Sequence, residues 1–244
     1  MQSNISIITL TLNNEKSLEE CLKSVSWADE IIIVDEGSKD KTLEIAKKFN
    51  SKIVKTNEIR FDKKRNLGFK KASNKWLFYL DSDEIISPQL KKEILQIVKQ
   101  NKIGTYEVKR ENYFLGKKMY HDKNTRLFHK SLHSGWVGKV HETPIYNGKK
   151  EKLKSLLTHN THTDIYSMLE KTNKWSAFEA ELRYEANHPP VKAWRVVRIA
   201  ITEFYNQFFK KRVFKYGAAG WIEGVFQVVD KTIVYIKLWE LQQK

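Results

Sequence analysis

The chain has 244 residues, enough to bury one large α/β domain together with an appendage. Its 44 lysines and arginines outnumber 29 aspartates and glutamates, and the formal net charge of +15 favours anionic partners: nucleic acid, an anionic membrane surface or a phosphorylated substrate. The one cysteine, Cys21, excludes an internal disulfide framework and is typical of a reducing compartment.

The first hundred residues alternate between strand and helix patterns, with short connections between them. Strands are expected at residues 5–12, 31–34, 52–55 and 76–80, and helices from residue 13 and at residues 39–49, 61–72 and 89–99. Ser38 is expected to cap the second helix. Repeated units of this kind predict an α/β fold with a mostly parallel, Rossmann-like sheet flanked by helices.

Beyond residue 100 the regularity fades. Shorter strands are expected at residues 106–109, 125–129 and 156–159, followed by a long helix at residues 165–187 that ends at two prolines. Two further helical patterns, hinged around residues 217–220, complete the chain. We therefore expect an α/β domain over residues 1–165 and a helical C-terminal region over residues 166–244.

Three acids, Asp81, Asp83 and Glu84, follow the fourth predicted strand directly. A strand buried on both faces should not end in such charges unless they meet something positive, and the carboxyl edge of an open sheet is where α/β proteins bind ligands. Carboxylates there suit Mg²⁺ or Mn²⁺ shared with the phosphates of a substrate. The alternative is a solvated acidic turn that caps the helix after Ser87. The spacing leaves both interpretations open.

A second strand end carries the acid Asp35, and in a doubly wound sheet the two ends can converge on one crevice. Residues 62–68 lie between them and supply cations, including Arg65, that can offset a diphosphate. Neither G-x-G-x-x-G after the first strand nor G-x-x-x-x-G-K-[ST] occurs, which disfavours a dinucleotide-binding Rossmann protein and a P-loop NTPase. Phosphate binding is therefore expected to depend on metal and cations.

Four motifs occur in order: IITLTLNNE at residues 7–15, IVDEGSKD at 33–40, KRNLG at 64–68 and LDSDE at 80–84. This set resembles the inverting family 2 glycosyltransferases of the GT-A fold. WADE at residues 27–30 and VHE at residues 140–142 resemble the branch that adds glucose to the inner core of bacterial lipopolysaccharide. The resemblance covers roughly residues 4–165; the C-terminal region shares only its basic, aromatic character.

The resemblance implies a nucleotide-sugar site at matching positions. Leu10, Thr11 and Leu12 would border the base, and Asn13 belongs to the same nucleotide-sugar site. Asp35 matches the acid that holds uracil or ribose. Arg65 matches the cation beside the nucleotide. Asp81 matches the first acid of the Asp-x-Asp pair, which touches ribose or sugar.

The resemblance also implies a metal and a catalytic base. Asp83 matches the acid that binds Mg²⁺ or Mn²⁺, and His159 sits where a further ligand is often found, although His159 and His162 can equally be unrelated histidines. Relatives often place the base in a Glu-Asp pair that this chain lacks. Glu142 is our candidate base, the alternative being that it only orients substrate or forms an ion pair. The cations expected to bind phosphates of the acceptor are Lys109, Arg126 and Lys139. The alternative is that each of them is a solvated surface charge.

The region from residue 191 to the end combines eleven aromatic residues with lysines and arginines. Rings at an acyl boundary and cations against headgroups are what a helix lying on a membrane needs. The alternative is a helical subdomain packed on the sheet. No apolar run approaches the ~20 residues of a spanning helix, and the N-terminus has no signal-peptide layout. We expect a cytoplasmic protein, peripheral on the inner face of the bacterial cytoplasmic membrane.

The leading hypothesis is transfer of a hexose, glucose above all, from a UDP-sugar with inversion to the heptose of a lipopolysaccharide core. A polyprenyl-phosphate, capsule or other glycan acceptor is the alternative within the family. A sugar-1-phosphate nucleotidyltransferase would need a glycine-rich phosphate loop after the first strand, and none is present. A non-catalytic nucleic-acid-binding protein would leave the acids at the strand ends without a use, because they repel phosphate. No nucleic-acid partner is therefore expected.

Overall fold

The computed structural model describes residues 3–138, 142–162 and 164–244. The chain divides into two compact units. The sheet unit comprises Met1–Glu111 and His121–His159, and the helical unit comprises Asn112–Tyr120 and Asn160–Lys244. The candidate site lies in the sheet unit, so the two units are considered separately.

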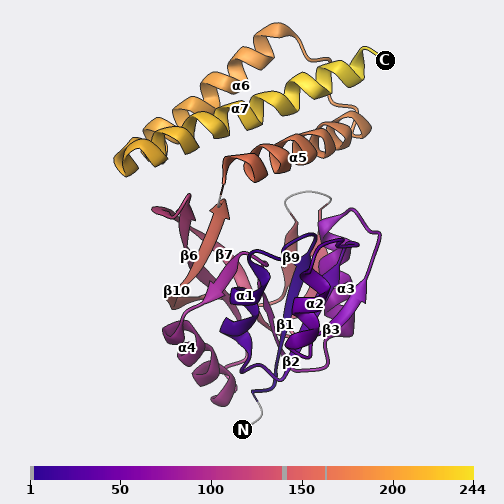
Figure 1. Ribbon diagram of the computed structural model, residues 1–244, viewed down its shortest axis with the longest axis vertical. Helices are drawn as coiled ribbons and strands as arrows, with labels where there is room; N and C mark the ends of the chain where they lie inside the picture. The colour runs from indigo at the N-terminus through magenta and orange to yellow at the C-terminus, as the bar shows by residue number, and fades with distance from the viewer. Residues whose placement is uncertain (1–2, 139–141, 163) are drawn as a thin grey trace. The chain divides into compact units, whose positions relative to one another are not determined.

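The amino-terminal half of the sheet is parallel, as predicted. The elements of the first hundred residues are β1 (Ile5–Thr11), α1 (Leu18–Val25), β2 (Glu30–Asp35), α2 (Thr42–Lys48), β3 (Lys52–Lys55), α3 (Phe61–Lys71), β4 (Trp76–Tyr79), β5 (Glu84–Ile86) and α4 (Pro88–Lys99); of these strands, β5 lies outside the parallel half. The strands β3, β2, β1 and β4 pair in parallel in that order (Figure 1). Their carboxyl ends therefore meet at one edge of the sheet, where β4 runs into the acidic cluster.

Antiparallel strands extend this sheet beyond β4. They are β6 (Thr105–Phe114), β7 (Lys117–His129) and β10 (Lys150–His162), while β8 (His133–Val137) and β9 (Thr143–Tyr146) form a separate hairpin. The complete order among the described residues is β3-β2-β1-β4-β7-β6-β10-β5. These strands are longer than predicted. Their end portions contain polar, exposed residues among the apolar ones, so the sequence there has no continuous apolar run that would indicate a strand. The α/β class is confirmed; among the described strands the sheet is mixed and not mostly parallel as predicted, because parallel pairing is limited to β3, β2, β1 and β4.

Alternating side chains of the central strands fill two hydrophobic clusters. Ile31 and Ile33 of β2 join the cluster that α1 and α4 contribute to, whereas Ile32 and Val34 join the cluster on α3 and the β8–β9 hairpin. This alternation is the period of a strand buried on both faces. Gly68 lets α3 approach closely, because a Cβ there would lie 2.4 Å from Ile8 Cγ2.

The helical unit contains α5 (Ile165–Glu185), α6 (Ala193–Tyr205), the π-helical turn η1 (Asn206–Lys210), the 3₁₀ turn η2 (Val213–Tyr216) and α7 (Gly217–Gln242). Asp164 caps α5 by accepting a hydrogen bond from Ser167 N at 2.7 Å. Helix α7 contacts both α5 and α6 (Figure 1). The residues expected as a hinge form the first turn of α7. No helix in the described part of the chain is long and apolar enough to cross a membrane.

Candidate active site

The loops after β1 and β2 are hydrogen-bonded to one another at the carboxyl edge of the sheet. Asn13 N donates to Ser38 Oγ at 2.9 Å, and Asn13 Oδ1 accepts from Lys39 N at 2.8 Å. Asn13 has a left-handed backbone, with φ of 53°, a conformation that asparagine tolerates better than most residues. Because these residues are committed to loop–loop bonds, α1 and α2 begin several residues later than the sequence pattern predicts.

Asp35 is fully buried at the end of β2 and organises its own loop. Its Oδ1 accepts hydrogen bonds from the backbone of Gly37 and Ser38, both at 3.0 Å. Its Oδ2 accepts from the hydroxyls of Thr11, at 3.1 Å, and Ser38. The prediction that Ser38 caps α2 is therefore wrong, because its hydroxyl binds Asp35 and the residue before α2 is Lys41. Asp35 and Thr11 stand together as expected; their contact with a nucleotide stays a prediction.

Arg65 is the centre of the site. Its Nη2 donates to Asp81 Oδ1 at 3.0 Å and its Nε donates to Glu142 Oε1 at 2.7 Å, so one guanidinium joins two of the predicted site residues. The guanidinium carbon lies 4.9 Å from the ring centroid of Trp136 and 5.7 Å from that of Tyr79. Paired with two carboxylates and placed near two aromatic rings, the buried side chain is held in one orientation.

A second arginine, Arg126 of β7, binds Asp81, the first acid of the Asp-x-Asp segment, and Glu84, the acid that follows it. It donates to both carboxylate oxygens of Asp81 and, at 2.6 Å, to Glu84 Oε1. Glu84 is fully buried; it also accepts from Arg110 at 3.0 Å and, through Oε2, from Asp81 N at 2.9 Å. Glu84 thus forms part of a buried ion-pair network and holds the backbone of Asp81. Ser87, not Glu84, caps α4 through Leu90 N.

The pKa of the two acids moves in opposite directions. Burial alone would raise the pKa of Asp81, but the guanidinium groups of Arg126 and Arg65 outweigh it and hold that pKa well below its ordinary value. Burial raises the pKa of Glu84, and its arginine partners offset this only in part while the charge on Asp81 adds to it. Asp81 is thus the acid of the pair that its arginine partners keep ionised.

Arg65, Asp81, Arg126 and Glu142 line a cavity of about 400 Å³ in the sheet unit, whereas Glu84 does not. Among the described residues, its walls carry five cations and three acids: Arg65, Arg110, Lys123, Arg126, Lys150, Asp81, Glu107 and Glu142. Trp136, Thr143 and Pro144 complete one side. Such a polar, highly charged cavity suits a sugar and its phosphates better than an apolar ligand. Lys109 is exposed on β6 and is not among the lining residues, whereas Lys139, Val140 and His141 lie outside the described residues.

Asp83 and His159 lie beside this cluster. His159 Nε2 is 3.6 Å from Asp83 Oδ1, because His159 on β10 is paired in register with Glu84 on β5. His162, three positions further along the same strand, instead has its ring 6.1 Å from that of Phe114. Within the described residues no group of three or more histidine, cysteine or acidic side chains is arranged to hold a metal.

The β8–β9 hairpin is fixed to α3 by Asn66, a residue whose role was not foreseen. Asn66 Nδ2 donates to Trp136 O and Asn66 Oδ1 accepts from Trp136 N, both at 2.8 Å. A Cβ at Gly135 would lie 2.6 Å from Asn66 Oδ1, and the φ of Gly135 is 112°. The asparagine of the KRNLG motif thus anchors the hairpin that carries Trp136 to the side chain of Arg65. Asn66 belongs to a motif that the sequence singles out, but its role in fixing the hairpin is visible only from the hydrogen bond to Trp136, 70 positions away.

His133, the first residue of β8 in this hairpin, contacts the Tyr79 side chain, and its burial is expected to make the stability of the protein depend on pH. Burial lowers the pKa of His133 from 6.5 to about 4, and the Tyr79 hydroxyl lies 3.0 Å from its Nε2. Between these values the unfolded chain binds a proton that the folded chain does not, so stability falls as the pH falls. We expect His133 to contribute a loss of about 2 kcal/mol between pH 7 and pH 5, measured by urea unfolding. His133→Gln should remove that part of the slope; an unchanged slope would contradict a buried neutral histidine.

Comparison with known proteins agrees with this architecture. The model of the family "Glycosyl transferase family 2" matches residues 6–169. An uncharacterised glycosyltransferase of Rickettsia bellii is 25% identical over 99% of this chain and 88% of its own length. The lipopolysaccharide core biosynthesis glycosyltransferase LpsC of Rhizobium meliloti is 23% identical over 97% of this chain and 92% of its own length.

Solved structures give the fold. The crystal structure of Staphylococcus aureus TarS 1–349 in complex with UDP-GlcNAc aligns with a TM-score of 0.50 at 14% identity, covering 100% of this chain and 92% of that chain. This chain spans about half of a longer TarS chain, 50% of its length. The family match covers well over half of the chain and includes all four ordered motifs. The chain belongs to glycosyl transferase family 2 and is a transferase with the GT-A fold.

Proposed function

We propose that the protein transfers a hexose, glucose in the first instance, from a UDP-sugar with inversion to the heptose of a lipopolysaccharide core at the inner face of the cytoplasmic membrane. The observation that carries the proposal is the convergence of Arg65, Asp81, Arg126 and Glu142 on one polar cavity at the carboxyl edge of the sheet. The likeness to LpsC over nearly the full chain supports this acceptor class, and the TarS complex supports a UDP-sugar donor.

On the donor side, the loops after β1 and β2 form the nucleotide end. Asn13 and Thr11 lie on the first loop and strand, and Asp35 fixes the second loop against them. Asp81 is ionised and is bound by two arginines, and its carboxylate accepts a hydrogen bond from a hydroxyl of the ribose or the sugar. Arg65 supplies positive charge where the diphosphate leaves.

The residues for a divalent cation are Asp83 and His159. Two protein ligands are few, but Mg²⁺ commonly takes only one or two carboxylates from the protein and completes its shell with substrate phosphates and water. A carboxylate oxygen and an imidazole nitrogen 3.6 Å apart suit that arrangement and suit Mn²⁺ equally. When bound, Mg²⁺ or Mn²⁺ neutralises charge that develops on the departing diphosphate.

Glu142 is the proposed general base. Its carboxylate is partly exposed at the cavity wall, and Arg65 holds one of its oxygens, which orients the side chain towards the space beside Asp81. An acceptor hydroxyl bound there transfers its proton to Glu142 while the acceptor oxygen attacks the anomeric carbon from the face opposite the diphosphate, which leaves. Attack from that face inverts the configuration.

The helical region of residues 166–244 is proposed to hold the surface that contacts the membrane carrying the acceptor. Large apolar side chains are exposed along α6 and α7, including Trp194, Ile201, Trp221 and Trp239, each about half exposed or more. Monomeric soluble surfaces rarely expose so many large side chains together. With the basic charge of the chain, this composition favours an anionic bilayer.

The proposal is tested by UDP binding, measured by calorimetry with and without Mn²⁺. We expect Mn²⁺ to tighten binding in the natural protein and Asp83→Ala to abolish that gain. His159→Ala should weaken the Mn²⁺-dependent part by at least about tenfold, because even residues that only orient metal ligands cost 10–100-fold. His162→Ala, on the same strand but apart from Asp83, is the matched control and should leave UDP binding unchanged. Tightening that survives in Asp83→Ala, or metal-independent DNA binding, would contradict the assignment.

A further inference from the structure

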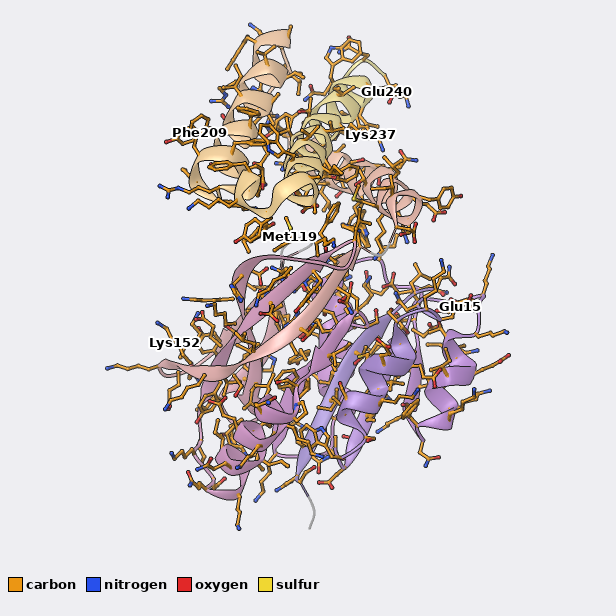
Figure 2. All side chains as sticks on the ribbon, turned by 60° about the vertical axis from the view of Figure 1, so that its left-hand side comes forward. Glu15, Met119, Lys152, Phe209, Lys237 and Glu240 are labelled. Carbon is orange, nitrogen blue, oxygen red and sulfur yellow. The ribbon has the colours of Figure 1, made fainter. Side chains whose placement is uncertain are left out.

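The connection between α6 and α7 carries a dense group of exposed aromatic rings. We call residues 204–222, which include the end of α6, η1, η2 and the start of α7, the aromatic tip. Its exposed rings are those of Phe204, Tyr205, Phe209, Phe214 and Trp221, and Phe209 is 61% exposed. Figure 2 shows Phe209 on the outer side of its helix. Five exposed rings within 18 positions need a physical explanation.

The inner side of the tip is tightly packed, so these rings are not exposed through loose folding. Val213 and Phe208 are buried beneath α7. A Cβ at Gly220 would lie 1.8 Å from Val213 O, and one at Gly224 would lie 2.9 Å from Phe208 Cζ. The two glycines of α7 therefore let the connection fold back directly onto the helix. The tip is a preformed surface.

The backbone of the tip decides which rings face inwards. The π-helical turn at Asn206–Lys210 places Phe208 inside, where its ring stacks 4.5 Å from Phe204 and lies 4.8 Å from Trp221. Its neighbour Phe209 faces out and stacks on Tyr205 at 5.3 Å. π-Helical turns of this kind occur frequently at functional sites. The exposed rings are thus held in a fixed, stacked arrangement.

Cations accompany the rings, and acids are absent from this segment of the sequence. Lys210, Lys211, Arg212 and Lys215 are all exposed, and no aspartate or glutamate occurs from residue 204 to residue 222. Lys210 lies 5.8 Å from the ring centroid of Tyr205, and Arg212 is held in the left-handed region with φ of 55°. The combination is that of an interfacial anchor, in which rings enter the acyl boundary and cations meet headgroup phosphates.

The same chemistry continues along α6. Trp194, Val197 and Ile201 are each more than half exposed and recur at helical spacing before Phe204. Arg195 and Arg198 flank this stripe, and both lie over the ring of Trp194, at 5.4 Å and 5.3 Å. A helix that lies in the plane of a membrane presents such a stripe along its length.

We infer that the aromatic tip is the part of the protein that docks on an anionic bilayer, with its rings at the acyl boundary and its four cations on lipid phosphates. The inference rests on the membrane contact in the proposed function and adds the surface of the protein that makes this contact. It requires neither donor nor acceptor. A result against it therefore leaves the sugar-transfer proposal standing.

The test is sedimentation of the full chain with vesicles of phosphatidylcholine alone or with added phosphatidylglycerol. Binding should need phosphatidylglycerol and weaken as salt rises. Lys210→Gln/Lys215→Gln should weaken it about 30-fold, since each cation near such a surface contributes about 1 kcal/mol. Phe209→Ser/Phe214→Ser should weaken binding at least as much at every salt concentration.

The matched control is Tyr166→Ser/Leu169→Ser on α5 of the same unit, where both side chains are more than half exposed. It removes comparable exposed apolar surface from α5 while leaving every residue of the tip unchanged, and it should bind phosphatidylglycerol vesicles as the natural protein does. Each variant should retain its circular dichroism and thermal unfolding. Equal losses in the α5 and tip variants would overturn the assignment to the tip, as would equal binding to uncharged vesicles.

Discussion

Replacing Arg126 by methionine is expected to lower the free energy of unfolding by about 3 kcal/mol. Arg126 is buried between Asp81 and Glu84, and removing one partner from a buried ion pair leaves charge without compensation. We expect the lower end of the range known for buried pairs, because Arg65 still binds Asp81 and Arg110 still binds Glu84. Urea unfolding followed by tryptophan fluorescence measures the change.

The double variant Arg126→Met/Glu84→Gln should recover part of that loss. Glutamine has no charge to leave unpaired, and its oxygen can still accept from Asp81 N as Glu84 does. Lys150→Met is the matched control, since its pair with Glu107 is also short, at 2.7 Å, but Lys150 is more than a third exposed. It should cost less than about 1 kcal/mol. Similar losses for Arg126→Met and Lys150→Met would show that the buried network is not what stabilises the site.

Glu142→Gln is expected to reduce the turnover of hexose transfer by about 10²–10⁴-fold, the usual contribution of a positioned general base. UDP-sugar binding should change little, because glutamine can still accept the hydrogen bond from Arg65 Nε. Turnover and donor affinity are measured separately, by a coupled UDP-release assay at saturating donor and by calorimetry. Loss of affinity with normal turnover would identify Glu142 as a residue that only orients Arg65.

Adding a small carboxylate to the assay distinguishes a general base at position 142 from a residue that only orients Arg65. Glu142→Ala removes the side chain beside a cavity of about 400 Å³, which has room for a formate ion. If Glu142 is the base, formate should restore part of the turnover of Glu142→Ala and leave the natural enzyme unaffected. Failure of formate, together with only a modest loss in Glu142→Gln, would place the base elsewhere.

Much of the parallel half of the fold follows from local pattern. The strand β3 has the predicted bounds, and β4, α3 and α4 agree to within one residue. The apolar strand β4 and the amphipathic helix α4 are recognisable because their patterns are complete within a short window. Ser38 was assigned wrongly for a complementary reason. A serine before a helix is typical of a cap, yet the Ser38 hydroxyl donates to the buried Asp35 and its oxygen accepts from Asn13 N, so both bonds lie within the loops.

The antiparallel half was harder to predict, since it depends on pairing between distant segments. The strands β5, β8 and β9 are short, and only their partners define them; β5 pairs with β10 more than 70 residues later in the chain. Asn66 illustrates the same point, because its amide serves a strand 70 positions away. No local pattern encodes such contacts.

The family, the order of the motifs and the candidates Asp35, Arg65, Asp81, Asp83 and Glu142 could be inferred from residue type and spacing, which are properties of the chain. How the charges of these residues are paired became visible in the folded protein. Arg65 joins Asp81 to Glu142, and Arg126 joins Asp81 to Glu84, across separations of 16 to 77 residues. Charges are paired by distance and burial in space, and both depend on how the sheet brings remote strand ends to one edge.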